Sequence, residues 1–169
     1  MQTQQLTEQL KTLRLRGMAS ALEDSLTALS QKKLAPTMWL AQLLQAEMAD
    51  RQARSYEYQL RLARFPVSRD LDSFEFKESV VNETQLRQLY AGDYLTTARN
   101  IVFVGGTGTG KSHLATALAR NVILQGKRAR FYSVVDLVNQ LDAEKRVGRA
   151  GNLAGRLLNQ DVIVLDSCC

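Results

Sequence analysis

The chain has 169 residues, of which 45% are apolar and 23% are charged, and its net charge is +5. This length and composition are typical of a soluble globular protein with one domain, or with a small domain beside part of a larger one. No apolar run approaches the roughly 18 to 20 residues that cross a bilayer, and the first residues do not resemble a signal peptide. We therefore expect a cytoplasmic protein with no membrane contact.

The first 65 residues predict a small all-helical domain. Apolar residues between positions 6 and 29 recur at spacings of three to five, which indicates one or two helices with a break near Gly17. Pro36 stands at the start of a second helical pattern, where its missing amide is harmless. That pattern ends at Phe65 and Pro66, because proline disfavours the helical conformation in the preceding residue.

Residues 66–80 have no clear period and predict a connector, and residues 81–169 predict part of an α/β domain. Asn82 can cap a helix that ends at Gly92. "IVFVGG" at 101–106 predicts a strand buried on both faces. Further segments follow in alternation: a helix over 111–125, a strand at 129–134, helices near 135–146 and 152–159, and a strand at 162–165. Such alternation is typical of a parallel sheet.

The segment "GGTGTGKS" carries the clearest chemistry. It fits the phosphate-binding pattern G-x-x-x-x-G-K-[ST] in full, and the candidate nucleotide ligands are Gly105, Gly106, Thr107, Gly108, Thr109, Gly110, Lys111 and Ser112. Glycines let the backbone turn its N–H groups inward as an anion-binding nest, and the following helix adds its positive dipole end. Lys111 would supply charge to the phosphates and Ser112 a hydroxyl to Mg²⁺. The pattern therefore predicts ATP as the cofactor, with Mg²⁺.

Asp166 ends the last predicted strand, and it is the candidate second Mg²⁺ ligand. The carboxyl ends of parallel strands face the crevice in which ligands bind, although a polar residue there can also simply end a strand. Ser167 follows, and a hydroxyl is not a base at neutral pH, so no catalytic residue is assigned. His113 lies one residue beyond Ser112 and has no partner at useful spacing, which favours a packing or helix-start role.

Basic residues gather in clusters, which is compatible with contact to a nucleic-acid backbone but also with a solvated helix face. The candidate DNA contacts are Lys127, Arg128, Arg130, Arg146 and Arg149. The two cysteines, Cys168 and Cys169, are adjacent and terminal, so they cannot staple a fold. No Cys/His set has metal-ligand spacing.

With these motifs the chain resembles the IstB-like ATP-binding family, the AAA+ helper ATPases of insertion-sequence transposition, which are relatives of DnaC-type helicase loaders. The likeness runs through "LRLRGMASALE", "LDSFEF", "NIVFVGGTGTGKSHLATALA", "GKRARFYSVVDLVNQL" and "QDVIVLD". It implies an AAA+-like P-loop NTPase that assembles on DNA as a homo-oligomeric ring and works with a transposase. It also implies that Phe74 and Phe76 lie on the adenine side of the nucleotide, or that they pack the connector onto the domain.

The resemblance also predicts where this chain departs from the family. Ser167 stands where the family has a glutamate, and the family's domain continues further, so we expect an incomplete sheet and a chain that binds ATP without hydrolysing it. The strand at 101–106 would then lack both of its neighbours. Two alternatives stay open: a DnaC-like helicase loader, and a non-catalytic fragment that keeps only its helical contacts.

Overall fold

A computed structural model describes residues 2–32, 35–66 and 69–167 of the chain. The predicted cysteine tail at 168–169 lies outside the described residues. The chain divides into two compact units, Met1–Glu57 and Tyr58–Cys169, and the boundary falls inside one long helix.

The N-terminal unit is helical. It contains α1 (Gln2–Thr12), α2 (Arg16–Lys32) and the first part of α3 (Pro36–Ala63). The break predicted near Gly17 lies a few residues earlier, at residues 13–15, where Arg14 takes a left-handed φ of 61°, and Gly17 itself belongs to α2. Pro36 begins α3, as the sequence predicts. The core of this unit is formed by Met18 and Leu22 of α2 with Leu43 of α3.

Helices α2 and α3 approach each other most closely at Gly17. A Cβ atom at this position would lie 2.5 Å from the backbone oxygen of Ala46, so α2 can pack here only with glycine. The buried Glu47 carboxylate accepts hydrogen bonds from the backbone N–H groups of Gly17 (2.8 Å) and Met18 (3.3 Å). A hydrogen bond from Arg51 lowers the pKa of Glu47, against the opposing effect of burial. The carboxylate therefore accepts hydrogen bonds from N–H groups in the first turn of α2, which lack partners within the helix.

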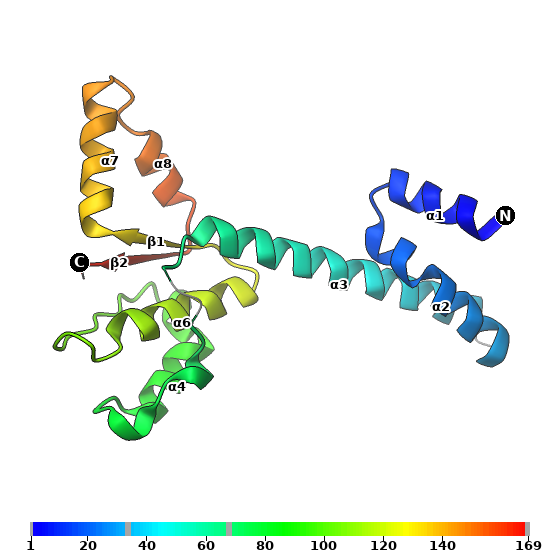
Figure 1. The fold of residues 1–169 in the computed structure, drawn as a ribbon, viewed down its shortest axis with the longest axis horizontal. Helices are drawn as coiled ribbons and strands as arrows, with labels where there is room; N and C mark the ends of the chain where they lie inside the picture. Colours follow the sequence, from blue (N-terminus) through cyan, green and yellow to red (C-terminus); the bar gives the residue numbers. More distant parts are fainter. Residues whose placement is uncertain (1, 33–34, 67–68, 168–169) are drawn as a thin grey trace. The chain divides into compact units, whose positions relative to one another are not determined.

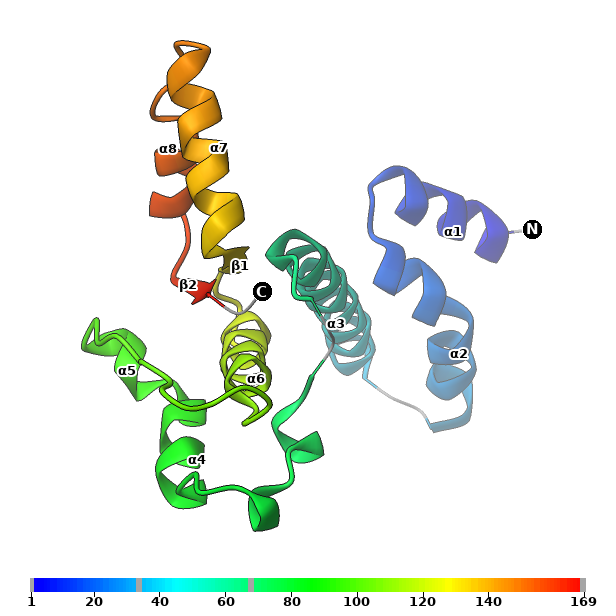
Figure 2. The same ribbon diagram turned by 60° about the vertical axis from the view of Figure 1, so that its left-hand side comes forward.

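The connector after α3 contains two short 3₁₀ turns, η1 (Leu71–Ser73) and η2 (Phe76–Glu78). It leads into α4 (Glu83–Ala91), where the Asn82 side chain accepts from the backbone N–H of Gln85, as the sequence predicts. Gly92 ends α4 with a φ of 95° and precedes the short α5 (Asp93–Thr96). In Figure 2, α4 packs beside α6 (Lys111–Leu124).

A small parallel sheet lies beyond α6. Strand β1 (Ala129–Ser133) pairs with β2 (Val162–Asp166), in a register that joins Ala129 to Val162 and Ser133 to Asp166. Helices α7 (Val134–Arg146) and α8 (Asn152–Leu158) connect the two strands. Helix α6 packs against both strands (Figure 1). The predicted α/β alternation is confirmed from α6 to β2, although helix dominates the described residues and the sheet is small.

The prediction of a buried strand at 101–106 is wrong. These residues form no strand, and the exposed fractions of Val102 and Val104 are 80% and 92%. Ile101 and Phe103 do pack, against a core that includes Leu114 of α6. A strand needs hydrogen-bonding neighbours, and among the described residues β1 and β2 pair only with each other. The apolar run thus keeps one packed face without joining the sheet.

A bilayer requires helices that are both long and apolar. In residues 2–32, 35–66 and 69–167, no helix combines the length and the apolar character that a membrane span requires.

Candidate nucleotide site

The glycine-rich loop links the extended segment at 101–104 to the first turn of α6. Gly108 and Gly110 take φ angles of +78° and +84°, a conformation that L side chains rarely adopt. The loop residues from Gly105 to Thr109 are exposed. The positive φ angles therefore turn the chain tightly into the helix and leave the loop accessible from solvent.

The aromatic ring of Phe74 lies directly on Gly110. A Cβ atom at position 110 would lie 2.5 Å from the Cε2 atom of Phe74, which no real pair of carbon atoms tolerates. Glycine is thus required here for two reasons, its backbone conformation and the ring above it. The connector and the loop consequently constrain each other.

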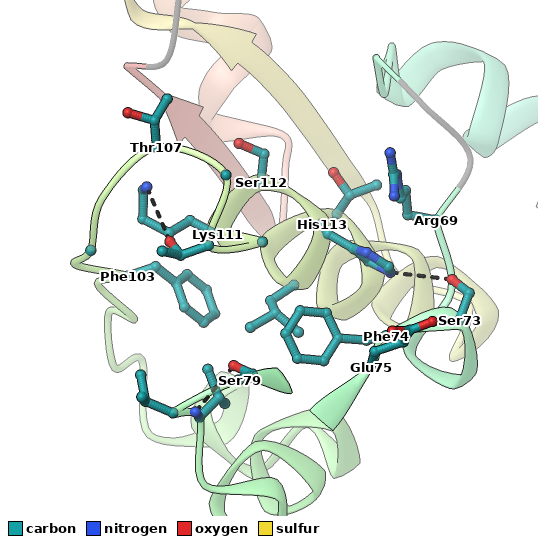
Figure 3. A pocket seen from close by; sticks show the side chains of 18 of the residues that line it. Arg69, Ser73, Phe74, Glu75, Ser79, Phe103, Thr107, Lys111, Ser112 and His113 are labelled. Atoms are coloured by element: carbon teal, nitrogen blue, oxygen red, sulfur yellow. Dashed lines mark hydrogen bonds between the residues drawn. The ribbon is translucent and has the colours of Figure 1, made fainter. Parts of the chain in front are cut away.

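Lys111 points back into the loop. Its ammonium Nζ donates a hydrogen bond to the carbonyl oxygen of Gly106 at 2.5 Å, and the hydroxyl of Thr109 donates to the same oxygen at 2.9 Å. Figure 3 shows the lysine side chain inside the curve of the loop. A positive charge is therefore held where the loop surrounds it, at the N-terminal end of α6, which is a favourable place for an anion.

Ser112 and Asp166 are 54 residues apart in the chain, and the fold brings them together. The hydroxyl of Ser112 donates to Oδ2 of Asp166 at 2.5 Å. The contact arises because α6 begins and β2 ends at the same edge of the unit. Serine hydroxyl and aspartate carboxylate oxygens are the hard ligands that Mg²⁺ prefers.

The donor set fits a magnesium ion that is shared with a nucleotide. Within the described parts of the chain, no group of three or more His, Cys, Asp or Glu side chains could hold a metal by itself. Protein sites for Mg²⁺ commonly supply only one or two ligands and take the others from phosphates and water. Ser112 and Asp166 match that arrangement.

A cavity of about 830 Å³ adjoins the loop. Its walls include Lys111, Ser112 and Thr107 on the loop side, and Phe74 and Phe103 on the other side. Figure 3 shows the Phe74 and Phe103 rings on the side of the cavity away from Thr107. Charged and polar groups at one end and aromatic groups at the other are what a nucleotide requires, and the volume is in the usual range for ligand sites, roughly 300–1,000 Å³.

The two connector phenylalanines have different surroundings. Phe74 lines the cavity, whereas Phe76 packs edge-on against Phe74, with ring centres 5.0 Å apart, and lies under the guanidinium group of Arg87. Phe76 also contacts the core that contains Leu86 and Leu118. Phe74 packs against the same core, so both phenylalanines pack the connector, and Phe74 in addition borders the cavity.

His113 contacts the connector, in agreement with its predicted packing role. Its Nε2 atom lies 2.8 Å from the backbone oxygen of Asp70 and 3.3 Å from the hydroxyl of Ser73, and its ring meets Phe74 edge-on at 5.3 Å. Because a carbonyl oxygen only accepts, Nε2 carries the proton. Asp70 and Ser73 were missed by the sequence reasoning, since a separation of about forty residues gives no local signal.

The candidate DNA contacts are not brought together with this loop. Lys127, Arg128 and Arg130 stand at the beginning of β1, while Asp166 is at the end of β2, the opposite edge of a parallel pair. Arg130 is partly buried and its guanidinium lies over the Tyr132 ring at 5.3 Å.

The remaining candidate DNA contacts are Arg146, the last residue of α7, and Arg149, which follows the helix, and both are exposed. Ser167, which follows Asp166, is exposed as well.

The chain was compared with known proteins. The family described as "IstB-like ATP binding protein" matches residues 8–169. The "Insertion sequence IS5376 putative ATP-binding protein" of Geobacillus stearothermophilus is 33% identical over 132 residues, which cover 76% of this chain and 51% of the relative. A similarly named protein of insertion sequence IS1162 from Pseudomonas fluorescens is 31% identical over 98% of this chain and 73% of the relative. An IS21-like protein of Bacteroides fragilis is 26% identical over 96% of this chain and 82% of the relative. The chain thus spans about half the length of the Geobacillus protein.

Proposed function

Because this chain belongs to the family of IstB-like ATP binding proteins, we propose that it binds ATP with Mg²⁺ at residues 105–112 and serves as a helper protein in DNA transposition. Relatives named for their insertion sequences support the transposition context. We place its action in the cytoplasm, at DNA and beside a transposase, with self-assembly into a homo-oligomer as in the family.

One observation carries the proposal of nucleotide binding. The Ser112 hydroxyl and the Asp166 carboxylate lie 2.5 Å apart, beside a loop that curls around the Lys111 ammonium. Sequence spacing alone does not require these groups to meet. Their meeting supplies a charge for phosphates and two oxygen ligands for a cation at one edge of the same unit.

Each residue has a distinct task in this proposal. The loop N–H groups and the Lys111 ammonium bind the phosphate oxygens, and Phe74 borders the part of the cavity that takes the base. Ser112 and Asp166 hold Mg²⁺, which when bound offsets the negative charge of the phosphates. Ser167 cannot take a proton from water, so we propose that residues 1–169 bind ATP without turning it over.

The test is equilibrium binding of ATP to the purified chain and to a Lys111→Ala variant, each with and without Mg²⁺. We expect the variant to lose at least about tenfold in affinity, because a charge-assisted contact to phosphate contributes roughly 1.5–3 kcal/mol. Chelation of Mg²⁺ should weaken binding to the unsubstituted chain. Equal ATP affinity in the Lys111→Ala variant would remove the support for this site.

We propose that DNA is contacted through the basic residues outside the loop. Arg146 and Arg149 are the strongest candidates, because both are exposed, whereas Arg130 is partly buried against Tyr132. Such contacts would be to phosphates and independent of base sequence. Co-purification of the chain with the transposase of the same insertion sequence, compared with an unrelated transposase, tests the partner.

A further inference from the structure

The connector is attached to α6 through Asp70. The backbone oxygen of Asp70 accepts from His113, and its carboxylate pairs with Arg120 at 3.2 Å. His113 and Arg120 are seven residues apart, about two turns, so they lie on one face of α6. Between these contacts Leu71 is buried in the core with Leu114 and Ala117. The connector is therefore anchored along α6 rather than loosely attached.

The hydrogen bond from His113 is not needed to satisfy the Asp70 carbonyl. The same oxygen also accepts from the Ser73 hydroxyl at 2.8 Å and from the Ser73 backbone N–H at 3.3 Å. Loss of the histidine would leave no buried acceptor without a partner, and such an unsatisfied group is the usual source of a large penalty. Leu71 would still be buried. Loss of this hydrogen bond alone should therefore leave the unit folded.

The same histidine contacts Phe74 and the turn that precedes it. The Phe74 ring meets the His113 ring edge-on at 5.3 Å. The His113 N–H donates to Asp70 and, in a longer branch of 3.3 Å, reaches the Ser73 hydroxyl, so it contacts both ends of η1, which directly precedes Phe74. On its other side the Phe74 ring rests on Gly110 of the loop and lines the cavity. Figure 3 shows His113 and Ser73 joined by a hydrogen bond beside the Phe74 ring.

We propose that His113 is a positioning residue, which holds the turn at 70–74 against α6 so that Phe74 forms the base-side wall of the cavity. The inference rests on the proposed nucleotide binding. In this arrangement His113 supports affinity for the nucleoside part of ATP and not for its phosphates, which Lys111 and the loop bind. A residue with a merely structural role would affect both parts alike.

The experiment compares two probes, ATP and inorganic tripolyphosphate, both with Mg²⁺, on the full chain of 169 residues. For His113→Ala we expect ATP affinity to fall about fivefold to tenfold, as loss of one positioning hydrogen bond implies, and tripolyphosphate affinity to change less than about twofold. His113→Gln keeps a donor at a similar reach without the ring, and it should retain most of the ATP affinity. His113→Phe keeps a ring without the donor, and it should behave as His113→Ala does.

A second measurement covers the case in which His113→Ala does not fold. Arg69 and Lys77 flank the turn and are exposed, so trypsin can report on it. ATP should slow cleavage after these residues in the unsubstituted and His113→Gln chains but not in His113→Phe, and tripolyphosphate should protect none of them.

An equal fall in affinity for ATP and tripolyphosphate in His113→Ala, or unchanged ATP affinity in His113→Ala and His113→Phe, would overturn the role of His113. The proposed nucleotide binding would be unaffected by either result. An unsubstituted chain that binds tripolyphosphate as tightly as ATP would overturn the base-side wall. Failure of the unsubstituted chain to bind either probe would instead overturn the proposed nucleotide function, and the inference with it. Lys111→Ala is the matched control, because it should weaken both probes together.

Discussion

Three glycines of the glycine-rich loop allow backbone strain and steric contact to be separated. Gly106 has no positive φ, and a Cβ there would meet nothing within 4 Å. Gly108 has a φ of +78° and equally open surroundings, whereas Gly110 has a φ of +84° and a Cβ there would lie only 2.5 Å from the Phe74 ring. Alanine at the three positions should therefore have graded effects on the free energy of unfolding.

The expected magnitudes follow from these geometries. Gly106→Ala should change stability by less than about 0.5 kcal/mol, as is usual for an exposed site. Gly108→Ala should cost about 1 kcal/mol, because an L residue is strained in the left-handed region. Gly110→Ala should cost about 2–4 kcal/mol, because the same backbone strain is joined by a steric effect. The new methyl group would displace Phe74 from its edge-on contacts with Phe76 and His113, and each contact contributes roughly 0.5–1.5 kcal/mol.

Thermal unfolding, followed by circular dichroism, measures the stability of these variants. The melting temperature of a unit of this size should fall by about 4 °C for each kcal/mol of lost stability. A double-mutant cycle with Phe74→Ala isolates the steric part. In the Phe74→Ala background, the cost of Gly110→Ala should fall to that of Gly108→Ala. If Gly108→Ala is as damaging as Gly110→Ala, or if Phe74→Ala gives no relief, the contact between connector and loop is not what requires glycine at position 110.

Three further predictions concern hydrolysis, pH and DNA. ATP turnover by the chain should not exceed that of the Lys111→Ala variant in a phosphate-release assay, because Ser167 is no base; turnover well above this control would contradict the assignment. The lowered pKa of Glu47 means that its stabilising effect is fully present above its ordinary pKa of 4.5 and is lost as pH falls through the folded-state pKa. As pH is lowered below 4.5, the melting temperature of the helical unit should therefore fall more in the unsubstituted chain than in Glu47→Gln. DNA affinity should fall as the salt concentration rises. Replacing Arg146 and Arg149 with alanine should reduce the slope of log affinity against log salt concentration by about 0.9 per lost phosphate contact. An unchanged slope would show that neither arginine contacts a phosphate.

Local signals in the sequence determined most of the element boundaries. Pro36 opens α3, Asn82 caps α4, and Gly92 ends it, because each effect acts within a few residues of the chain. The glycine-rich loop was recognised in the same way, from spacing within eight residues. The parallel pairing of β1 and β2 follows from the helices between them, since such a connection favours parallel strands.

The segment at 101–106 shows where local signals fail. Its apolar run is typical of a buried strand, yet it lies outside the sheet, with Val102 and Val104 exposed. Strand formation depends on hydrogen bonds to a neighbour that can be far away in the sequence. Composition reports that a segment is suited to a sheet, whereas pairing depends on a distant neighbour, which the local pattern does not describe.

The contacts that define the site were likewise decided by the fold. Ser112 meets Asp166 across 54 residues, and His113 meets Asp70 across 43. The sequence by itself determined which residue types are present and which local elements carry them, because caps, turns and periodicity depend on near neighbours. Which of two phenylalanines reaches the cavity was decided only when the connector packed against α6, because that choice depends on the shape of a distant surface.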